Sequence, residues 1–463
     1  MFVFIYSGTT KAPQTEVFIN FVVKFDKMNQ QLTKAAYFTL GCKLNFAETS
    51  TIGKVLSGRG IIRAAKGETP DLCVVNTCSV TEVADKKGRR LIRSLAARYP
   101  GVPIVVTGCY AQLKPLEVAE LPGVAIVLGS DEKLRMAEFV DEFIRSRQKK
   151  VEVTPFLSIK DFRPSCERGD RTRYFLKVQD GCDYFCTYCT IPFARGRSRS
   201  GSIGELVEMA RRAAADGGKE IVITGVNIGE FGKDNGQDLF TLLRSLDEVE
   251  GIERFRISSI EPNLLTEEIV RWTATEARAF MPHFHIPLQS GSDSVLKLMN
   301  RRYDTSLFAS RVELVRSLIP DAFIGVDIIA GARGETAEEW EKSRAFAESL
   351  DVTRYHVFPY SERPGTKALL LGDVVSQEEK HRRVSVLTEI SDRKMGQFMA
   401  AASGSIRPVL WEQPSEDGFM HGLTDNYIRV EAPLHNELIN TVSPVKLGKI
   451  HPNQPELMTA QHV

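Results

Sequence analysis

The sequence predicts an α/β protein made of an N-terminal parallel α/β domain, a central partial (β/α)6 barrel and a small C-terminal β-barrel. Short β-rich runs alternate with amphipathic helical patterns from residue 35 to about residue 370, as in parallel sheets. A long helical pattern follows Val375, and residues 403–463 read as short strands separated by Pro and Gly. Such a series of strands and turns is typical of a small β-barrel.

Length and composition indicate several domains. The chain has 463 residues, of which 43% are hydrophobic, so it can bury more than one core. We expect a disordered extension over 1–30, an N-terminal domain over 31–150, a linker over 151–172, a barrel core over 173–372, a connecting helix over 373–402 and the C-terminal barrel over 403–463.

Charge and cysteine usage limit the function classes. The net charge is +1, so any contact with nucleic acid has to come from a local patch. Eight cysteines, mostly clustered, are too few for a secreted disulfide scaffold. No apolar run is long enough for a membrane span. We therefore expect a cytoplasmic protein that does not associate with a membrane.

The N-terminal domain repeats one pattern three times. The runs AYFTLGC, DLCVVNTC and PIVVTGC end in Cys42, Cys78 and Cys109. Helical patterns separate these runs, at Glu48 to Ser57, Thr81 to Tyr99 and Leu116 to Leu121. The carboxyl ends of parallel strands share one edge of a sheet, so the three cysteines should converge there. Lone cysteines are often inert small hydrophobes, and we interpret Cys73, inside its strand, and Cys166, in the linker, as non-ligands.

The segment GCDYFCTYCT carries the strongest signal in the chain. Cys182, Cys186 and Cys189 are spaced C-x3-C-x2-C. Zinc sites usually have four protein ligands, and no further Cys or His follows nearby, so three thiolates indicate an iron–sulfur cluster with one iron left open. Three buried or zinc-binding cysteines are the alternative.

The middle of the chain reads as six β-α units whose motif loops fall at the strand carboxyl ends, where ligands bind in such barrels. The expected strands are Tyr174 to Gln179, Glu220 to Thr224, Phe255 to Ser258, His283 to Pro287, Phe323 to Ile329 and Tyr355 to Phe358. Polar and glycine residues at these ends can approach and hold a cofactor: Thr224, Gly225, Ser259, Glu261, Gln289, Ser290 and Gly291. We expect His283 and His285 to be packed or hydrogen-bonded.

Several motifs, in this order, resemble the methylthiotransferases, which are radical S-adenosylmethionine (SAM) enzymes. They are LGCKLNFAET, NTCSVTEVADKKGRR, TGCYAQ, GCDYFCTYC, SSIEP, HIPLQSGSDSVLKLMNRRY and HVFPYSERPGT. The resemblance implies that Cys182, Cys186 and Cys189 hold a [4Fe-4S] cluster that cleaves SAM to a radical. It also implies that Cys42, Cys78 and Cys109 hold a second [4Fe-4S] cluster, and that the central barrel is a radical SAM core. One departure is Ala332 and Arg333, where the family usually has Phe-Pro, so the resemblance does not specify the SAM contacts of this loop, although it still implies the same chemistry.

The first two motifs look most like the branch that acts on N6-threonylcarbamoyladenosine next to the anticodon of tRNA. The branches that modify isopentenyladenosine in tRNA, or an aspartate of a ribosomal protein, share the cysteine pattern and remain alternatives. A further alternative is an iron–sulfur protein that binds tRNA without modifying it.

The family resemblance also implies a two-step chemistry. One SAM methylates a sulfur at the N-terminal cluster, and a second SAM gives the radical that opens an unactivated C–H bond of the adenine ring. The two clusters must then face a common cavity. The expected partners are tRNA, a reductant such as flavodoxin or ferredoxin, and a sulfur donor, with the enzyme as a monomer.

For RNA binding we expect the basic loop Arg195, Arg197 and Arg199 and the helical residues Lys86, Lys87 and Arg90 to contact phosphates. The C-terminal barrel resembles the RNA-contacting TRAM domain of this family. Its side chains are seven acidic against four basic, so we expect it to orient the RNA rather than to supply phosphate affinity.

Overall fold

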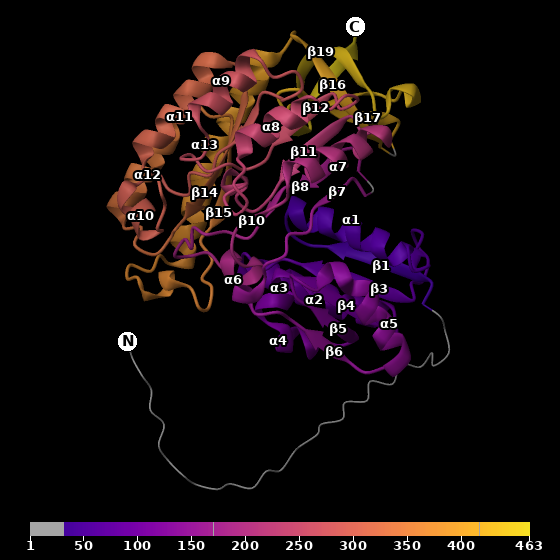
Figure 1. Ribbon diagram of the computed structural model, residues 1–463. Helices are drawn as coiled ribbons and strands as arrows, with labels where there is room; N and C mark the ends of the chain where they lie inside the picture. The colour runs from indigo at the N-terminus through magenta and orange to yellow at the C-terminus, as the bar shows by residue number, and fades with distance from the viewer. Residues whose placement is uncertain (1–31, 170, 416) are drawn as a thin grey trace.

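The computed structural model describes residues 32–169, 171–415 and 417–463, so the extension expected over 1–30 lies outside the described residues. The N-terminal sheet domain lies at the bottom of Figure 1, the barrel core above it and the C-terminal barrel at the top. The predicted α/β class, with a parallel N-terminal sheet and a small C-terminal β-domain, is confirmed.

The N-terminal domain is a six-stranded parallel sheet in the order β2-β1-β3-β4-β5-β6. Its strands are β1 Lys34–Thr39, β2 Ile62–Arg63, β3 Leu72–Thr77, β4 Ile104–Gly108, β5 Val124–Leu128 and β6 Lys150–Glu152. Its helices are α1 Lys43–Ser57, α2 Glu82–Arg98, α3 Cys109–Leu113, α4 Pro115–Ala119 and α5 Met136–Ser146. Apolar residues pack on both faces of the sheet, as is usual for parallel strands. Helix α1 begins at Lys43, directly after Cys42, rather than at Glu48.

The core is an incomplete barrel of six parallel strands in two sheets, β11 and β12 with β8, and β13-β14-β15, joined by a bridge between Ser259 and His285. Its strands are β8 Tyr174–Lys177, β11 Glu220–Thr224, β12 Arg254–Ile257, β13 His283–His285, β14 Phe323–Ala330 and β15 Arg354–Pro359. A short antiparallel ribbon joins β9 Gln179–Asp180 to β10 Arg199–Ser200. The core helices are α6 Ile191–Arg195, α7 Ile203–Ala215, α8 Leu239–Asp247, α9 Glu267–Thr275, α10 Asp293–Leu298, α11 Thr305–Leu318 and α12 Ala337–Ser349.

One strand of the core lies inside the segment expected to be a linker. The strand β7, Ser165–Glu167, pairs antiparallel with β8 at the sheet edge and buries Cys166. The surrounding composition is polar, so this three-residue strand had no hydrophobic signal of its own. Cys166 packs in a hydrophobic core cluster whose buried members include no other cysteine.

The helix α13, Gln377–Ala402, leads into a closed five-stranded barrel in the order β16-β17-β18-β20-β19. The strands are β16 Ile406–Pro414, β17 Phe419–Thr424, β18 Arg429–Pro433, β19 Val442–His451 and β20 Gln454–His462. Two buried arginines of β12 fix the barrel to the core. Arg254 Nη1 donates to the Leu423 carbonyl and Arg256 Nη2 to the Thr424 carbonyl, both at 2.8 Å, so polar backbone at this interface is satisfied.

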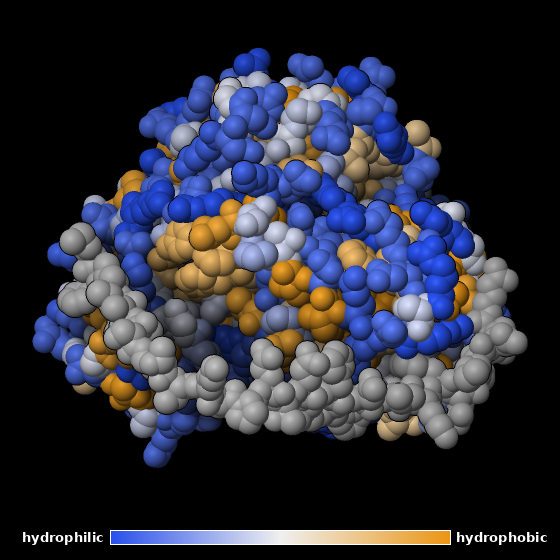
Figure 2. All heavy atoms as spheres, turned by 60° about the horizontal axis from the view of Figure 1, so that its bottom comes forward, coloured by the Kyte–Doolittle hydropathy of each residue, from blue (hydrophilic) through white to orange (hydrophobic). Residues whose placement is uncertain are grey.

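The surface seen in Figure 2 is mainly hydrophilic, with apolar patches near the centre of that face. Within the described ranges, no helix has both the length and the apolar composition that crossing a membrane would require.

Candidate active site

The central cysteines lie on a tight loop that follows β9. Gly181 has φ of 70°, and a Cβ at this position would lie 2.0 Å from the Arg197 carbonyl oxygen. Only glycine fits such a close backbone approach. Phe185, inside the motif, also has a left-handed φ of 48°. The loop is therefore folded back on itself around the three sulfurs.

Backbone amides donate to two of these sulfurs. The Tyr184 N–H donates to Cys182 Sγ and the Ile191 N–H to Cys189 Sγ, both at 3.4 Å. Burial raises the pKa of Cys182 to about 12 and raises the pKa values of Cys186 and Cys189. Free thiols at this site would therefore be neutral, whereas bound iron would deprotonate them. Amide donors stabilise thiolate ligands of clusters, so the loop fits the expected [4Fe-4S] cluster.

Arg301 links the third sulfur to a predicted cofactor residue. Its Nη1 donates to Cys186 Sγ at 3.1 Å, and its Nη2 forms an ion pair with Glu261. Burial raises the pKa of Glu261, although the positive charge of Arg301 opposes this rise. We had not predicted a role for Arg301, but it lies in the quoted motif MNRRY. Its cation beside a sulfur lowers the cost of negative charge at the cluster site.

The N-terminal cysteines come together at the carboxyl ends of adjacent strands β1, β3 and β4. Gly41 has φ of 107°, and a Cβ there would lie 2.7 Å from Cys78 Cβ. Burial raises the pKa of Cys78 to about 12, and the nearby thiols of Cys109 and Cys42 raise it further. The three sulfurs are thus close enough to interact electrostatically. Cys78 and Cys109 are buried, whereas Cys42 is exposed toward the cavity described below.

Neither cysteine set forms a site for a single ion. Within residues 32–169, 171–415 and 417–463, no three Cys, His, Asp or Glu side chains converge closely enough to hold one metal ion. A four-iron cube is wider than one ion, so its ligands lie further apart.

Two of the arginines expected to bind RNA are buried, and this prediction was wrong for them. Arg195 is 1% exposed and Arg199 is 6% exposed. Arg195 Nη1 lies 3.0 Å from both Glu48 Oε1 and Asp180 Oδ1, and Arg199 Nη2 lies 3.3 Å from Asp180 Oδ2. Because Glu48 belongs to α1, these ion pairs join the N-terminal domain to the core.

The same network contains two lysines. Lys133 Nζ lies 2.6 Å and Lys177 Nζ 3.1 Å from Glu48 Oε1. Burial alone would raise the pKa of Glu48, but the charges of Arg195, Lys133 and Lys177 lower it well below 4.5. Arg195 Nη2 also donates to Asn45 Oδ1 at 2.6 Å. The loops that carry the two cysteine sets are thus held by a charged network that solvent does not reach.

The other predicted RNA contacts lie on the surface. The side chain of Arg197 is 59% exposed, with Nη1 3.2 Å from Asp183 Oδ1. Lys86, Lys87 and Arg90 are exposed along α2, and Lys86 pairs with Glu82 at 2.9 Å. These four side chains are accessible to a large partner.

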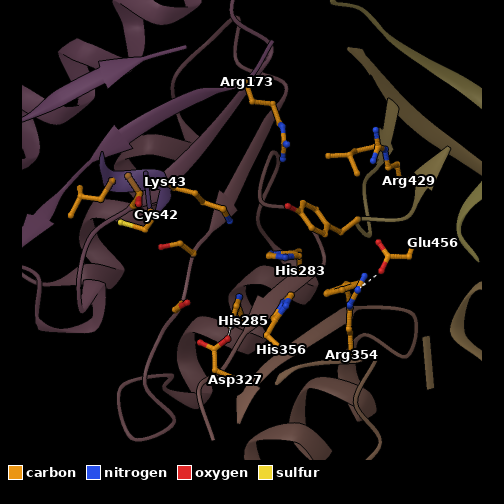
Figure 3. Close-up of a pocket in the computed structure, with 18 of the residues that line it drawn as sticks. Cys42, Lys43, Arg173, His283, His285, Asp327, Arg354, His356, Arg429 and Glu456 are labelled. Carbon is orange, nitrogen blue, oxygen red and sulfur yellow. Dashed lines mark hydrogen bonds and ion pairs between the residues drawn. The ribbon is translucent and has the colours of Figure 1, made fainter. Parts of the chain in front are cut away.

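A cavity of about 870 Å³ lies between the three parts of the molecule (Figure 3). Gly41, Cys42, Lys43 and Leu44 line it from the N-terminal domain, Thr224, Gly225, Ser258, Ser259, His283, His285, Asp327, Arg354 and His356 from the core, and Leu423, Tyr427, Arg429 and Glu456 from the C-terminal barrel. The loop after Thr224 continues to Asn227, whose Nδ2 lies 4.0 Å from Cys182 Sγ. Cys42 thus lines the cavity directly, whereas Cys182 is connected to it through the loop from Thr224 to Asn227.

The side chains of His285, Asp327 and His356 form a polar group on the cavity wall. Of these three, only His285 was singled out from the sequence. His285 Nε2 lies 2.8 Å from Asp327 Oδ1, and the rings of His285 and His356 stack with centroids 5.0 Å apart. Burial lowers the pKa of His356 to about 4, so this ring is neutral at physiological pH. As expected, His283 is packed, against Phe323. Asp327 and His356 are single residues within apolar strands, so no local motif marked them.

The predicted SAM-binding residues separate into two groups. Three of the seven predicted residues, Thr224, Gly225 and Ser259, line the cavity. The other four predicted residues are not among its described lining residues: Glu261, Gln289, Ser290 and Gly291. Gln289 adopts a left-handed φ of 68°, and Ser290 is fully buried. The Gly291 N–H donates to Ser343 Oγ of α12 at 2.8 Å, so this glycine serves helix packing.

The departure at Ala332 and Arg333 has a structural explanation. Ala332 is buried, and Arg333 Nε donates to Glu362 Oε1 at 2.8 Å. Arg333 Nη1 also donates to the carbonyls of Leu369 and Leu371. This arginine therefore holds the loop after β15 instead of facing the cavity.

Two known families match the chain. The Radical SAM superfamily matches residues 176–347, and the Uncharacterized protein family UPF0004 matches residues 34–129. The cysteine loop on an incomplete parallel barrel, together with the first match, defines a radical SAM enzyme, which uses a [4Fe-4S] cluster and SAM.

Curated relatives narrow this class. The chain is 36% identical to the threonylcarbamoyladenosine tRNA methylthiotransferase MtaB of Bacillus subtilis (strain 168), over 90% of this chain and 94% of that protein. It is 38% identical to the Thermotoga maritima protein of the same name, over 85% of this chain and 90% of that protein. It is 30% identical to the tRNA-2-methylthio-N(6)-dimethylallyladenosine synthase of Clostridium botulinum (strain Langeland), over 82% of this chain and 86% of that protein. The chain belongs to the radical SAM tRNA methylthiotransferase family.

A solved structure shares the fold. The radical SAM methyltransferase TsrM from Kitasatospora setae, with cobalamin and a [4Fe-4S] cluster bound, superposes with a TM-score of 0.54 at 14% identity. The match covers 89% of this chain and 83% of TsrM. At this identity the similarity shows the fold alone.

Proposed function

We propose that this enzyme converts N6-threonylcarbamoyladenosine next to the tRNA anticodon to its 2-methylthio derivative. The relatives named for this substrate reach 36% and 38% identity, and the relative named for dimethylallyladenosine 30%. This difference supports the threonylcarbamoyl branch. The nucleoside experiment described below distinguishes this substrate from the dimethylallyl one.

We propose that the enzyme carries two [4Fe-4S] clusters and consumes two SAM per product. Cys182, Cys186 and Cys189 would hold one cluster, and Cys42, Cys78 and Cys109 the other. When bound, these groups supply the one-electron chemistry that opens an unactivated C–H bond and the sulfur that is inserted there. The observation that carries the proposal is the cavity with Cys42 on one wall and the strand ends next to the Cys182 loop on the other.

The chain's own residues perform positioning and charge control in this proposal. The amides of Tyr184 and Ile191 and the guanidinium of Arg301 stabilise negative charge on the sulfurs. The network around Glu48 and Arg195 fixes the distance between the two cysteine sets. Rigid positioning of reacting groups supplies a large share of catalytic power.

The remaining parts serve the RNA. Arg197, Lys86, Lys87 and Arg90 would contact phosphates, and we withdraw Arg195 and Arg199 from this set. The C-terminal barrel would act as the TRAM domain and orient the anticodon loop, because its Tyr427 and Arg429 reach the cavity. Anticodon loops have unstacked bases that proteins can read. We further propose a cytoplasmic monomer that takes electrons from flavodoxin or ferredoxin and sulfur from a donor protein.

Mass analysis of tRNA nucleosides from cells with and without the gene tests the proposed function. We expect 2-methylthio-N6-threonylcarbamoyladenosine to disappear without the gene, and its N6-threonylcarbamoyl precursor to accumulate. Loss of the 2-methylthio-isopentenyl nucleoside instead would assign the other substrate. Unchanged tRNA nucleosides would contradict a role in tRNA modification.

A further inference from the structure

The charges that line the cavity are unevenly paired. Among the described residues, three carboxylates face it, and each has a cationic or imidazole partner. Glu456 pairs with Arg354, Glu412 Oε1 lies 3.1 Å from Arg173 Nε, and Asp327 Oδ1 lies 2.8 Å from His285 Nε2. Two further cations line the cavity, Lys43 and Arg429, and their side chains have no hydrogen bond or ion pair with any described residue.

These two unpaired cations differ in their surroundings. Arg429 is exposed, so water can solvate its guanidinium. Lys43 is partly buried at the first turn of α1, and Figure 3 shows its side chain extending from the Cys42 loop toward His283 and His285. An ammonium group in a partly enclosed site is costly without an anionic partner.

Among the described residues, the charge of Lys43 acts on the phenol of Tyr427 and the carboxylate of Asp327, and lowers the pKa of both, but Lys43 forms no ion pair with either group. Burial lowers the pKa of His283 well below 6.5, and the charges of Arg256 and Lys43 lower it further. The imidazole of His283 is therefore neutral, and the cavity carboxylate of Asp327 is already hydrogen-bonded to His285. The charge of Lys43 is thus available to a ligand.

We propose that Lys43 binds the carboxylate of the threonylcarbamoyl group and so selects this substrate. The proposal rests on the proposed function. The N6-threonylcarbamoyl group carries one carboxylate, whereas a dimethylallyl group is neutral and apolar and would leave the ammonium unpaired. A site that holds a charged group disfavours an analogue that lacks it, because its own polar group then loses its partner.

The position of Lys43 also suits the reaction. It directly follows Cys42, a proposed ligand of the cluster that handles the inserted sulfur. In adenine, C2 and the N6-bearing C6 flank the same ring nitrogen. A carboxylate held by Lys43 would therefore turn this edge of the base toward the N-terminal cysteines. Lys43 acts here as a substrate-positioning residue.

Binding of anticodon stem-loop RNA to the cluster-loaded protein tests the inference without turnover. The RNAs carry N6-threonylcarbamoyladenosine, its neutral carboxamide, or unmodified adenosine. We expect the wild-type protein to prefer the carboxylate over the carboxamide by about ten- to hundredfold, as for one charge-assisted hydrogen bond. Lys43→Met should abolish this preference, and Lys43→Arg should retain most of it. The matched control is Lys54→Met, on the solvent side of the same helix, which should leave the preference unchanged.

A labelling experiment on the wild-type protein covers the case in which Lys43→Met does not fold or does not hold iron. The carboxylate RNA should protect Lys43 from an amine-acylating reagent more than the carboxamide RNA does. A preference that survives in Lys43→Met, or equal protection by both RNAs, would overturn the inference. If the wild-type protein does not distinguish the threonylcarbamoyl RNA from the unmodified RNA, the proposed substrate itself is wrong.

Discussion

The most informative single substitution is Arg195→Met, because it separates a structural role from an RNA-binding role. Arg195 makes contacts of 3.0 Å to Glu48 and Asp180 and of 2.6 Å to Asn45, in a site that solvent does not reach. Breaking a buried ion pair costs about 3–5 kcal/mol. Lys133 and Lys177 still neutralise Glu48 in the variant. We therefore expect a loss of folding free energy at the lower end of this range, about 3 kcal/mol.

Thermal unfolding followed by circular dichroism measures this effect. For a large domain each kcal/mol shifts the unfolding midpoint by about 2–4 °C, so Arg195→Met should lower the midpoint by about 6–12 °C. The control Arg197→Met removes an exposed pair and should change stability by less than about 0.5 kcal/mol. Equal midpoints for both variants would refute the buried network. Weakened tRNA binding in Arg195→Met without a change in stability would restore the RNA-binding interpretation of this arginine.

The other predictions concern the cysteine sets and the cavity. Cys78→Ala should abolish sulfur insertion while 5′-deoxyadenosine still forms from SAM, whereas Cys186→Ala should stop both; insertion by Cys78→Ala, seen by mass spectrometry of the RNA, would contradict this. Gly41→Ala should reduce the iron bound by the N-terminal cysteines, because its φ is 107° and its Cβ would lie 2.7 Å from Cys78 Cβ, while Gly204→Ala, in open space, should keep full iron. Burial lowers the pKa of His356 to about 4, so the unfolded chain binds more protons between pH 4 and 6.5 and stability should fall as pH drops through this range. His356→Asn should flatten that dependence in denaturant titrations, and an unchanged slope would show that this ring does not contribute.

The strands and the cysteine sets could be predicted because their signals are local. The runs that end in Cys42, Cys78 and Cys109 are rich in apolar residues and have glycine or threonine directly before the cysteine. Parallel topology then determines where their ends lie. The structure indeed brings these cysteines to adjacent strands β1, β3 and β4. The start of α1 was misplaced because Lys43 and Asn45 are polar and obscure the helical pattern.

The charged network and the cavity could not be predicted because their partners are distant in sequence. Arg195 and Arg199 stand in a basic run that resembles a solvated loop, and one of their carboxylates, Glu48, comes from another domain. Likewise Lys43, Arg354 and Arg429 meet only after all three parts have folded. Pairing of charges across domains leaves no periodic pattern in the chain.

The central claim is that six cysteines hold two clusters beside one cavity. Iron and acid-labile sulfide analysis of anaerobically reconstituted protein tests it directly. The account predicts about eight irons per chain in the wild type and about four when either Cys182, Cys186 and Cys189 or Cys42, Cys78 and Cys109 are replaced by alanine. A wild-type protein that binds only about four irons, all lost with the Cys182 set, would contradict the account.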